Sequence, residues 1–247
     1  MTLENATLYT NTNALDEDIM IQPYHFTKEV GTNFIDFFKK VINCNGILCF
    51  DFEDSVNVLN QSDLADLKKN HRRKLLGKLQ NIALEIDFSR IGFRINSLDS
   101  AYYLDDIKEI EALGSVNCIF IPKIEHRIQI EKLIDILPDN IKEFIPIIET
   151  KTGFDNIEEI LSVKNEKFIK IAFGHCDFNL SHRYFPFFHQ DSILFWNWIM
   201  GLESSLKMAG KQLINSPVLV LENERYFSWV IKKNRSYKTI IPYLVII

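Results

Sequence analysis

Five carboxylates follow closely on apolar runs of this sequence. Asp51, Glu53 and Asp54 follow ILCF, Glu149 follows FIPII, and Asp177 follows FIKIAFG after two further residues. Carboxylates that are brought together repel one another, and a hard divalent cation relieves the repulsion. Mg2+ typically binds one or two protein carboxylates and takes its other ligands from substrate and water. The sequence therefore predicts a magnesium site with Glu149 and Asp177 as the best pair of ligands, and no His and Cys residues have zinc-site spacing.

Two cations and an amide occur in similar places. Arg94 and Asn96 alternate with apolar residues in IGFRIN, and Lys123 follows CIFIP. Because a strand that is buried on both faces is normally apolar, a charged residue within it costs several kcal/mol unless a partner or ligand compensates it. Side chains two residues apart share a strand face, so Arg94 and Asn96 are expected on one face, as are Asp51 and Glu53. These residues form either a ligand site or salt bridges that close one end of the fold.

The elements that would position these residues alternate along the chain. Short runs rich in Ile, Val and Phe are separated by longer segments with helical periodicity, which is typical of βα units and a parallel sheet. Eight strands are predicted, at residues 18–23, 47–53, 91–96, 118–123, 144–149, 168–174, 217–222 and 239–247. Eight βα units of about 30 residues need roughly 240 residues, which predicts a single (β/α)8 TIM barrel domain at 18–247 after a polar segment at 1–17. A doubly wound sheet is the alternative.

Three of the intervening segments have clear helical patterns. Leucines recur at helical spacing over residues 64–82, which predicts an amphipathic helix with a basic outer side. The basic residues between these leucines are Lys68, Lys69, Arg72 and Arg73. Asp99 and Gly114 are the expected N-terminal cap and C-terminal stop of a second helix, and a long third helix is predicted over 191–209.

The composition is that of a globular protein without a strongly charged partner. The chain has 247 residues, 47% of them hydrophobic, and a formal net charge of -5, so it lacks the basic surface that attracts nucleic acid or an anionic membrane. No apolar run has the length of a signal peptide or a membrane-spanning helix. The cysteines form no CxxC pair and are expected to be reduced and mostly structural, which predicts a cytoplasmic protein. They are Cys44, Cys49, Cys118 and Cys176.

The strand ends, taken in order, resemble the citrate lyase beta-subunit-like branch of the HpcH/HpaI aldolase family, within the phosphoenolpyruvate/pyruvate barrel superfamily. ILCFDFEDSV is similar to its acidic motif, FRIN to its arginine strand and IPKIE to its Pro-Lys strand. IPIIETKTG and FGHCDF are similar to its two metal-binding motifs. Lys69 and Arg73 fall where the family's helix carries a Lys and an Arg four residues apart.

The resemblance implies a Mg2+-dependent carbon–carbon lyase or aldolase. Its substrate would be a small 2-keto acid, hydroxy acid or acyl-CoA thioester, and the reaction would pass through a metal-stabilised enolate. Glu149 and Asp177 would bind the metal, and Arg94 would hold the carboxylate or enolate oxygen of the substrate.

The same resemblance suggests roles for the other polar residues. Arg94, Glu53 and Asp54 are the expected catalytic residues, and Lys123, Asp51 and Asn96 join Arg94 as expected substrate contacts. The general base is left open among Asp51, Glu53 and Asp54.

Some stretches depart from the family pattern. Residues 237–242 lack a glycine and have Ile241 where the family's last strand commonly has histidine, and the segment 177–185 lacks a usual glycine. Family members continue into a helix and a lid after the last strand, whereas this sequence ends at Ile247. The uncovered apolar strand is therefore expected to pack against residues 1–17 or against a second copy in a homo-oligomer.

Two other functions are compatible with these patterns. A hydroxyacyl-CoA thioesterase would use the same site with water as an extra reactant. A barrel that has lost catalysis would act as a binding or assembly module, although such a protein has no reason to retain buried carboxylates that cost stability.

Overall fold

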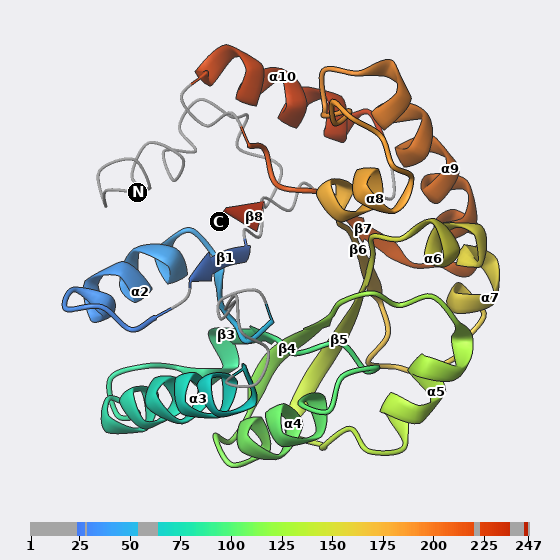
Figure 1. Ribbon diagram of the computed structural model, residues 1–247. Helices are drawn as coiled ribbons and strands as arrows, with labels where there is room; N and C mark the ends of the chain where they lie inside the picture. The colour runs from blue at the N-terminus through green and yellow to red at the C-terminus, as the bar shows by residue number, and fades with distance from the viewer. Residues whose placement is uncertain (1–23, 28, 54–63, 220–222, 238–244, 247) are drawn as a thin grey trace.

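A parallel sheet forms the centre of the computed structural model, which describes residues 24–27, 29–53, 64–219, 223–237 and 245–246. Its eight strands run in the order β7-β6-β5-β4-β3-β2-β1-β8. They are β1 (Tyr24–Thr27), β2 (Ile47–Asp51), β3 (Ile91–Arg94), β4 (Val116–Ile121), β5 (Ile141–Ile148), β6 (Lys170–Phe173), β7 (Gln212–Ile214) and β8 (Val245–Ile246). Figure 1 shows that the sheet curls and that the helices lie around its outside.

The strand order bears on the predicted fold class. Strands β1 to β7 are neighbours in sequence order, whereas a doubly wound sheet reverses its order at a switch point. Within the described part of the chain, β7 and β8 are the two edges of the sheet. The α/β class with a curled parallel sheet is therefore confirmed, and closure into a complete (β/α)8 barrel stays a prediction.

Helices follow most of the strands and cover the outer face of the sheet (Figure 1). They are α2 (Phe34–Asn43), α3 (Leu64–Asn81), α4 (Tyr103–Glu111), α5 (Arg127–Ile134), α6 (Lys151–Asp155), α7 (Ile157–Leu161), α8 (His175–Ser181), α9 (Ile193–Ala209) and α10 (Glu224–Arg235), with a short 3-10 turn η3 (Phe88–Arg90) before β3. None of the described helices is both long and apolar enough to cross a membrane.

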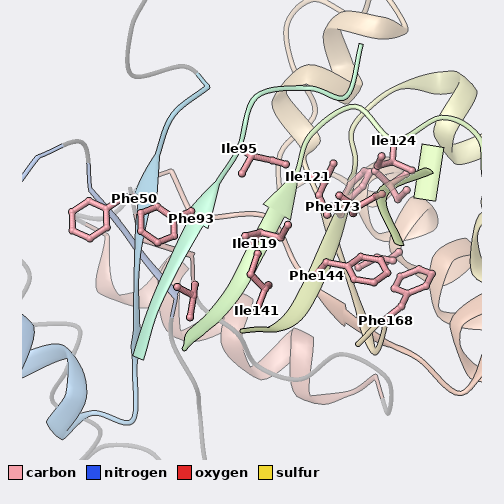
Figure 2. Close-up of a cluster of buried hydrophobic side chains, with 14 of the residues drawn as sticks. Phe50, Phe93, Ile95, Ile119, Ile121, Ile124, Ile141, Phe144, Phe168 and Phe173 are labelled. Carbon is pink, nitrogen blue, oxygen red and sulfur yellow. The ribbon is translucent and has the colours of Figure 1, made fainter. Parts of the chain in front are cut away.

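The hydrophobic core has two layers because side chains alternate along each strand. Phe50, Phe93, Ile119 and Phe144 belong to the large outer cluster between sheet and helices, which Figure 2 shows in close-up. A second cluster lies on the inner face of the curl. Its members are Tyr24, Ile47, Cys49, Cys118, Phe120, Ile145, Ile147, Ala172 and Ile214.

The same alternation decides where the strand-end charges point. Ile47 and Cys49 are in the inner cluster, and Asp51 is the next residue of β2 on that face. Ile145 and Ile147 precede Glu149 in the same way at the end of β5. The alternating pattern of the sequence therefore places both carboxylates on the inner face of the curled sheet.

Five predicted strands agree with β2 to β6 to within a few residues, but the next prediction is wrong. The seventh strand is β7 at Gln212–Ile214 instead of residues 217–222, and Pro217 to Leu219 belong to no strand. Val218 is apolar because it packs against Val230 and Ile231 of α10. The predicted first strand at 18–23 and most of the predicted last strand lie outside the described residues.

The predicted helices at 64–82 and 191–209 correspond to α3 and α9, but one face of α3 differs from the prediction. Lys69 and Arg73 are exposed, whereas Lys68 and Arg72 are buried at 8% and 2% exposure. The basic residues of α3 therefore do not form a single outer side, because two of them have polar partners in the interior. The predicted cap at Asp99 is also wrong, since α4 begins after Tyr102.

Candidate active site

A cavity of about 620 Å³ opens at the carboxyl ends of the strands. It is lined by four of the predicted site residues, namely Asp51 and Arg94 at the ends of β2 and β3, Glu149 directly after β5, and Asp177 in α8, which follows β6. The rest of the lining is largely apolar and includes Phe26, Phe120, Ile147, Ala172, Phe173 and Leu219. The structure thus brings together four residues that the sequence assigned to metal or substrate.

Arg94 is held at the cavity wall by two carboxylates. Its Nε donates to Asp51 Oδ1 at 2.9 Å and its Nη2 donates to Asp51 Oδ2 at 2.7 Å. Its Nη1 lies 3.4 Å from Glu53 Oε2. This two-point pairing fixes the plane of the guanidinium, and the side chain keeps 20% exposure toward the cavity.

Lys123 connects Glu53 and Glu149. Its Nζ donates to Glu53 Oε1 at 2.9 Å, and its backbone N–H donates to Glu149 Oε1 at 2.9 Å. The residue has a φ of 55°, a left-handed conformation that costs a non-glycine residue about 1–2 kcal/mol. Burial lowers the pKa of the Lys123 ammonium. The carboxylates of Glu53, Glu149 and Asp177 together raise this pKa by more than burial lowers it, so the pKa lies above its usual value.

Glu149 is the most perturbed acid of the cavity. Its side chain is 4% exposed, and burial together with the charges of Glu53 and Asp177 raises its pKa from 4.5 to about 8. Arg94 and the Lys123 N–H act in the opposite direction. A buried carboxylate that shares a cavity with two others is a site where a bound cation is strongly favoured.

Gly174 makes the position of Glu149 possible. A Cβ atom on residue 174 would lie 2.6 Å from Glu149 Oε2, closer than such atoms approach in folded proteins. The glycine follows β6 and is the N-cap residue of α8, whose first turn carries the half-buried Asp177. The Gly-x-x-Asp spacing therefore lets Glu149 approach the chain and places Asp177 beside the same cavity.

The donor set fits a hard divalent cation. Among the residues described, no group of three or more His, Cys, Asp and Glu side chains could hold a metal ion by itself. Glu149 and Asp177 offer carboxylate oxygens from two neighbouring elements, and Mg2+ needs only one or two of these when substrate and water complete its coordination. The chemistry of the pair fits Mg2+ better than Zn2+, which prefers a nearly complete set of His and Cys ligands.

Asn96 differs from its predicted position. Its Nδ2 donates to Asp106 Oδ2 at 2.7 Å and its Oδ1 accepts from Lys68 Nζ at 2.6 Å, so it contacts α3 and α4 and does not line the cavity. Strand β3 ends at Arg94, and the alternation that would keep both side chains on one face ends there as well. The predicted catalytic residue Asp54 lies outside the described residues.

Sequence reasoning missed the residues at the end of β7. Asn215 lines the cavity, and the Ser216 Oγ accepts the backbone N–H of His175 at 3.0 Å and donates to the carbonyl of Phe173. Ser216 thereby ties the end of β7 to the start of α8. The sequence contains a sign of this strand end, since LINSP has two small polar residues after a short apolar run. The strand is nevertheless predicted a few residues later, because the run PVLV is more apolar.

His175, which the sequence analysis did not assign to the site, is a buried residue of the cavity wall. Its Nε2 lies 2.8 Å from His189 Nδ1, and burial, with a further contribution from His189, lowers its pKa from 6.5 to about 4. The Cys176 Sγ lies 3.8 Å from the same Nε2, while burial and the charge of Asp177 raise the thiol pKa. A thiol with a raised pKa is a poor nucleophile, which agrees with the structural role expected for the cysteines.

The fold and the site define a class of protein. Its members are α/β proteins with a curled parallel sheet that carries an arginine and several carboxylates at the carboxyl ends of its strands. The family described as HpcH/HpaI aldolase/citrate lyase matches residues 44–194. The chain therefore belongs to the HpcH/HpaI aldolase/citrate lyase family.

Individual relatives agree with this assignment. The citrate lyase subunit beta of Leuconostoc mesenteroides subsp. cremoris is 28% identical over 149 residues, which are 56% of this chain and 46% of that protein. The chain thus matches about half the length of this relative.

Solved structures agree on the fold. The citrate lyase beta subunit from M. tuberculosis complexed with oxaloacetate and magnesium is 16% identical, with a TM-score of 0.69 and coverage of 92% of each chain. Protein CitE from Mycobacterium tuberculosis in complex with magnesium, acetoacetate and coenzyme A is 15% identical, with a TM-score of 0.70 and coverage of 92% of this chain and 77% of that one.

Proposed function

We propose that this chain is a Mg2+-dependent carbon–carbon lyase that acts on a small 2-keto acid, hydroxy acid or acyl-CoA thioester. The observation that carries the proposal is the single cavity lined by Arg94, Glu149 and Asp177. In this cavity Arg94 is a fixed cation for a substrate carboxylate, and Glu149 and Asp177 are two oxygen ligands for a metal. A substrate that has a carbonyl beside a carboxylate requires both.

Glu149 and Asp177 would hold the Mg2+ ion. The ion would supply Lewis-acid stabilisation of negative charge on the substrate's carbonyl oxygen. Gly174 gives Glu149 the room it needs, and the Lys123 N–H orients its carboxylate.

Arg94 would bind and orient the substrate. Its Nε and Nη2 are occupied by Asp51, so it would address a substrate oxygen from its exposed edge. In a low-dielectric cavity a fixed guanidinium stabilises a developing oxyanion without reorganising, which is the main electrostatic contribution expected in such sites.

Glu53 and Asp51 would act as positioning groups. Each carboxylate already contacts a cation, since Asp51 binds Arg94 and Glu53 binds both Arg94 and Lys123. Because both carboxylates are engaged in ion pairs, we propose the remaining acidic residue of this segment, Asp54, as the general base.

The relatives support the substrate class. The two M. tuberculosis structures bind magnesium with oxaloacetate or with acetoacetate and coenzyme A, which are keto acids and a thioester carrier. The cavity of about 620 Å³ is larger than a four-carbon keto acid requires, and its apolar lining suits an acyl group. We further propose a closed barrel, a homo-oligomer and a cytoplasmic location, as the sequence predicts.

Calorimetry with oxalate, a stable mimic of a 2-keto acid enolate, tests the function. We expect oxalate to bind in the presence of Mg2+ and not in its absence, and binding to be lost in Glu149→Gln and Asp177→Asn. Glu131→Gln is the matched control, since Glu131 is a half-exposed helix residue paired with Arg127. Absence of binding in the wild-type chain with Mg2+ present would refute the proposal. Detection of free CoA from a hydroxyacyl-CoA would identify thioester hydrolysis instead.

A further inference from the structure

A buried polar cluster contacts the main chain just after β2 and is formed by Lys68 and Arg72 of α3, Asn96 after β3 and Asp106 of α4. All four residues are buried, with exposures of 8%, 2%, 3% and 0% respectively. None of them lines the cavity. Buried charged groups cost free energy unless they are fully paired, so a cluster of this kind needs a structural or functional reason.

Lys68 is the member that contacts the site. Its Nζ donates to the main-chain carbonyl of Glu53 at 2.6 Å, to that of Phe52 at 3.3 Å and to Asn96 Oδ1 at 2.6 Å. An ammonium has three N–H donors, and these oxygens account for three contacts. Lys68 therefore binds the chain where it leaves β2, two residues after Asp51.

The other members of the cluster fix Lys68 and Asn96. Asp106 Oδ2 accepts from the Asn96 N–H at 2.8 Å and from its Nδ2 at 2.7 Å, while Asp106 Oδ1 pairs with Arg72. With its Nδ2 bound to Asp106, the Asn96 side chain presents its Oδ1 to Lys68. A chain of polar contacts thus runs from α4 through Asn96 and Lys68 to the main chain of Glu53.

The Glu53 side chain carries this effect into the cavity. Its carboxylate contacts Arg94 and Lys123, and its charge contributes to the raised pKa of Glu149. Residue 53 follows the end of β2, and its N–H donates to Asp51 Oδ1 at 3.0 Å. Its main-chain carbonyl accepts from Lys68, so a contact from α3 also acts on the residue that carries this carboxylate.

We propose that Lys68 is a positioning residue that holds the main chain at Phe52 and Glu53, so that the Glu53 carboxylate stays against Arg94 and Lys123. Its effect on ligand binding rests on the function proposed above, whereas its effect on the main chain does not. Lys69 gives a matched control, because it is the next residue of α3, carries the same charge and is exposed.

Amide hydrogen exchange tests the first part without any ligand. The N–H of Phe52 donates to the carbonyl of Arg94 at 2.9 Å and that of Glu53 donates to Asp51 Oδ1 at 3.0 Å. We expect Lys68→Met to accelerate exchange of both amides by about tenfold or more, as loss of a charged hydrogen-bond donor implies, and Lys69→Met to leave them unchanged. If Lys68→Met fails to fold, Lys68→Gln, which keeps an N–H donor, replaces it with a smaller acceleration expected.

A double-mutant cycle tests the second part. Affinity for Mg2+ and oxalate is measured for the wild type, Lys68→Met, Glu53→Gln and the double variant. If Lys68 acts through Glu53, Lys68→Met weakens binding by about tenfold in the wild-type background and by less than about twofold with Glu53→Gln. A merely structural role would give the same loss in both backgrounds.

The outcomes separate the two proposals. Unchanged exchange at Phe52 and Glu53, or an equal loss of affinity in both backgrounds, overturns the positioning role. Absence of oxalate binding in the wild type overturns the proposed function instead, and the exchange measurement then decides alone whether Lys68 holds the main chain.

Discussion

The backbone N–H of Lys123 donates to the Oε1 of Glu149 at 2.9 Å, and Lys123 adopts a φ of 55°. Strands β4 and β5 pair in the sheet. The turn after β4 thus orients the buried carboxylate of Glu149, which follows β5. Left-handed conformations at non-glycine residues persist where the surrounding structure holds them and are common at functional sites. Three interactions constrain one small region at the carboxyl ends of the strands. They are this hydrogen bond, the close approach of Gly174 to Glu149, and the ion pair of Arg94 with Asp51.

Replacement of Arg94 by lysine tests the two-point contact with Asp51. Lysine keeps the charge but has no planar fork, so it cannot bind both oxygens of Asp51 and still present an edge to the cavity. We expect Arg94→Lys to weaken Mg2+-dependent oxalate binding by about tenfold or more. Arg127→Lys is the control, since Arg127 forms a half-exposed ion pair of α5 and should leave affinity unchanged. Wild-type affinity in Arg94→Lys would show that the guanidinium geometry is not used.

Replacement of Gly174 by alanine tests the close approach to Glu149. The added Cβ would lie 2.6 Å from Glu149 Oε2 and 2.8 Å from its Cβ, so the carboxylate must move. We expect Gly174→Ala to weaken Mg2+ binding, measured by calorimetry, and to lower the free energy of unfolding by about 1–3 kcal/mol.

Gly77→Ala is the matched control for this change. A Cβ on Gly77 of α3 meets nothing within 4 Å, and alanine is the better helix former, so this variant should gain about 1 kcal/mol of stability. Equal behaviour of the two alanine variants in Mg2+ binding would contradict the role of Gly174.

The raised pKa of Glu149 predicts a pH dependence. With a folded-state pKa of about 8 against an ordinary value of 4.5, the metal-free folded protein holds a proton at Glu149 that the unfolded chain lacks between these values. The resulting stability is present below about pH 4.5 and is lost as the pH rises through about 8. Mg2+ must displace this proton, so its affinity should increase as the pH rises toward 8.

Calorimetry in two buffers of different ionisation enthalpy measures the proton released when Mg2+ binds. At pH 7 we expect release of close to one proton in the wild type and little release in Asp177→Asn if that variant no longer binds the metal. Binding of Mg2+ without proton release at pH 7 would show that Glu149 is ionised before the metal arrives.

The lowered pKa of His25 in β1 predicts a pH dependence of stability opposite to that of Glu149. Burial lowers its pKa from 6.5 to about 4, and its Nε2 has no hydrogen-bond partner in the described part of the chain. Between these pH values the unfolded chain binds a proton that the folded chain does not, so the stability contributed by a neutral His25 is lost as the pH falls from 6.5 toward 4.

An apolar replacement of similar volume tests this effect. Relative to wild type, His25→Leu should gain stability as the pH is lowered through this range, by at most about 3 kcal/mol, in denaturant unfolding at several pH values. A constant difference between the two proteins across the range would contradict it.

The central part of the fold, and most of the residues that line the candidate site, could be predicted from the sequence. A period-two pattern places Asp51 and Arg94 on the inner face of β2 and β3, and the same reasoning extends one residue beyond β5 to Glu149. The pattern stops working where strands end, because an irregular backbone no longer alternates its side chains. Asn96, two residues beyond β3, therefore turned out to contact Lys68 and Asp106 in the structure.

The burial of Lys68 and Arg72 in α3 follows from their helical positions. The spacing alone distinguishes Lys68 from Lys69, since Lys68 lies four residues after Leu64 and seven before Leu75 and therefore shares the face of the leucines. Assigning all four basic residues to one outer side was wrong because it followed their charge and not their helical positions. The short strand β7 was missed for a different reason, since three residues carry too little periodicity to compete with the apolar run that packs against α10.

The most direct test of the proposed function is a crystal structure of the chain with Mg2+ and oxalate. We expect one ion bound by carboxylate oxygens of both Glu149 and Asp177, with oxalate completing its coordination and contacting Arg94. An ion held by other residues, or a cavity that stays empty at saturating concentrations of both ligands, would contradict it.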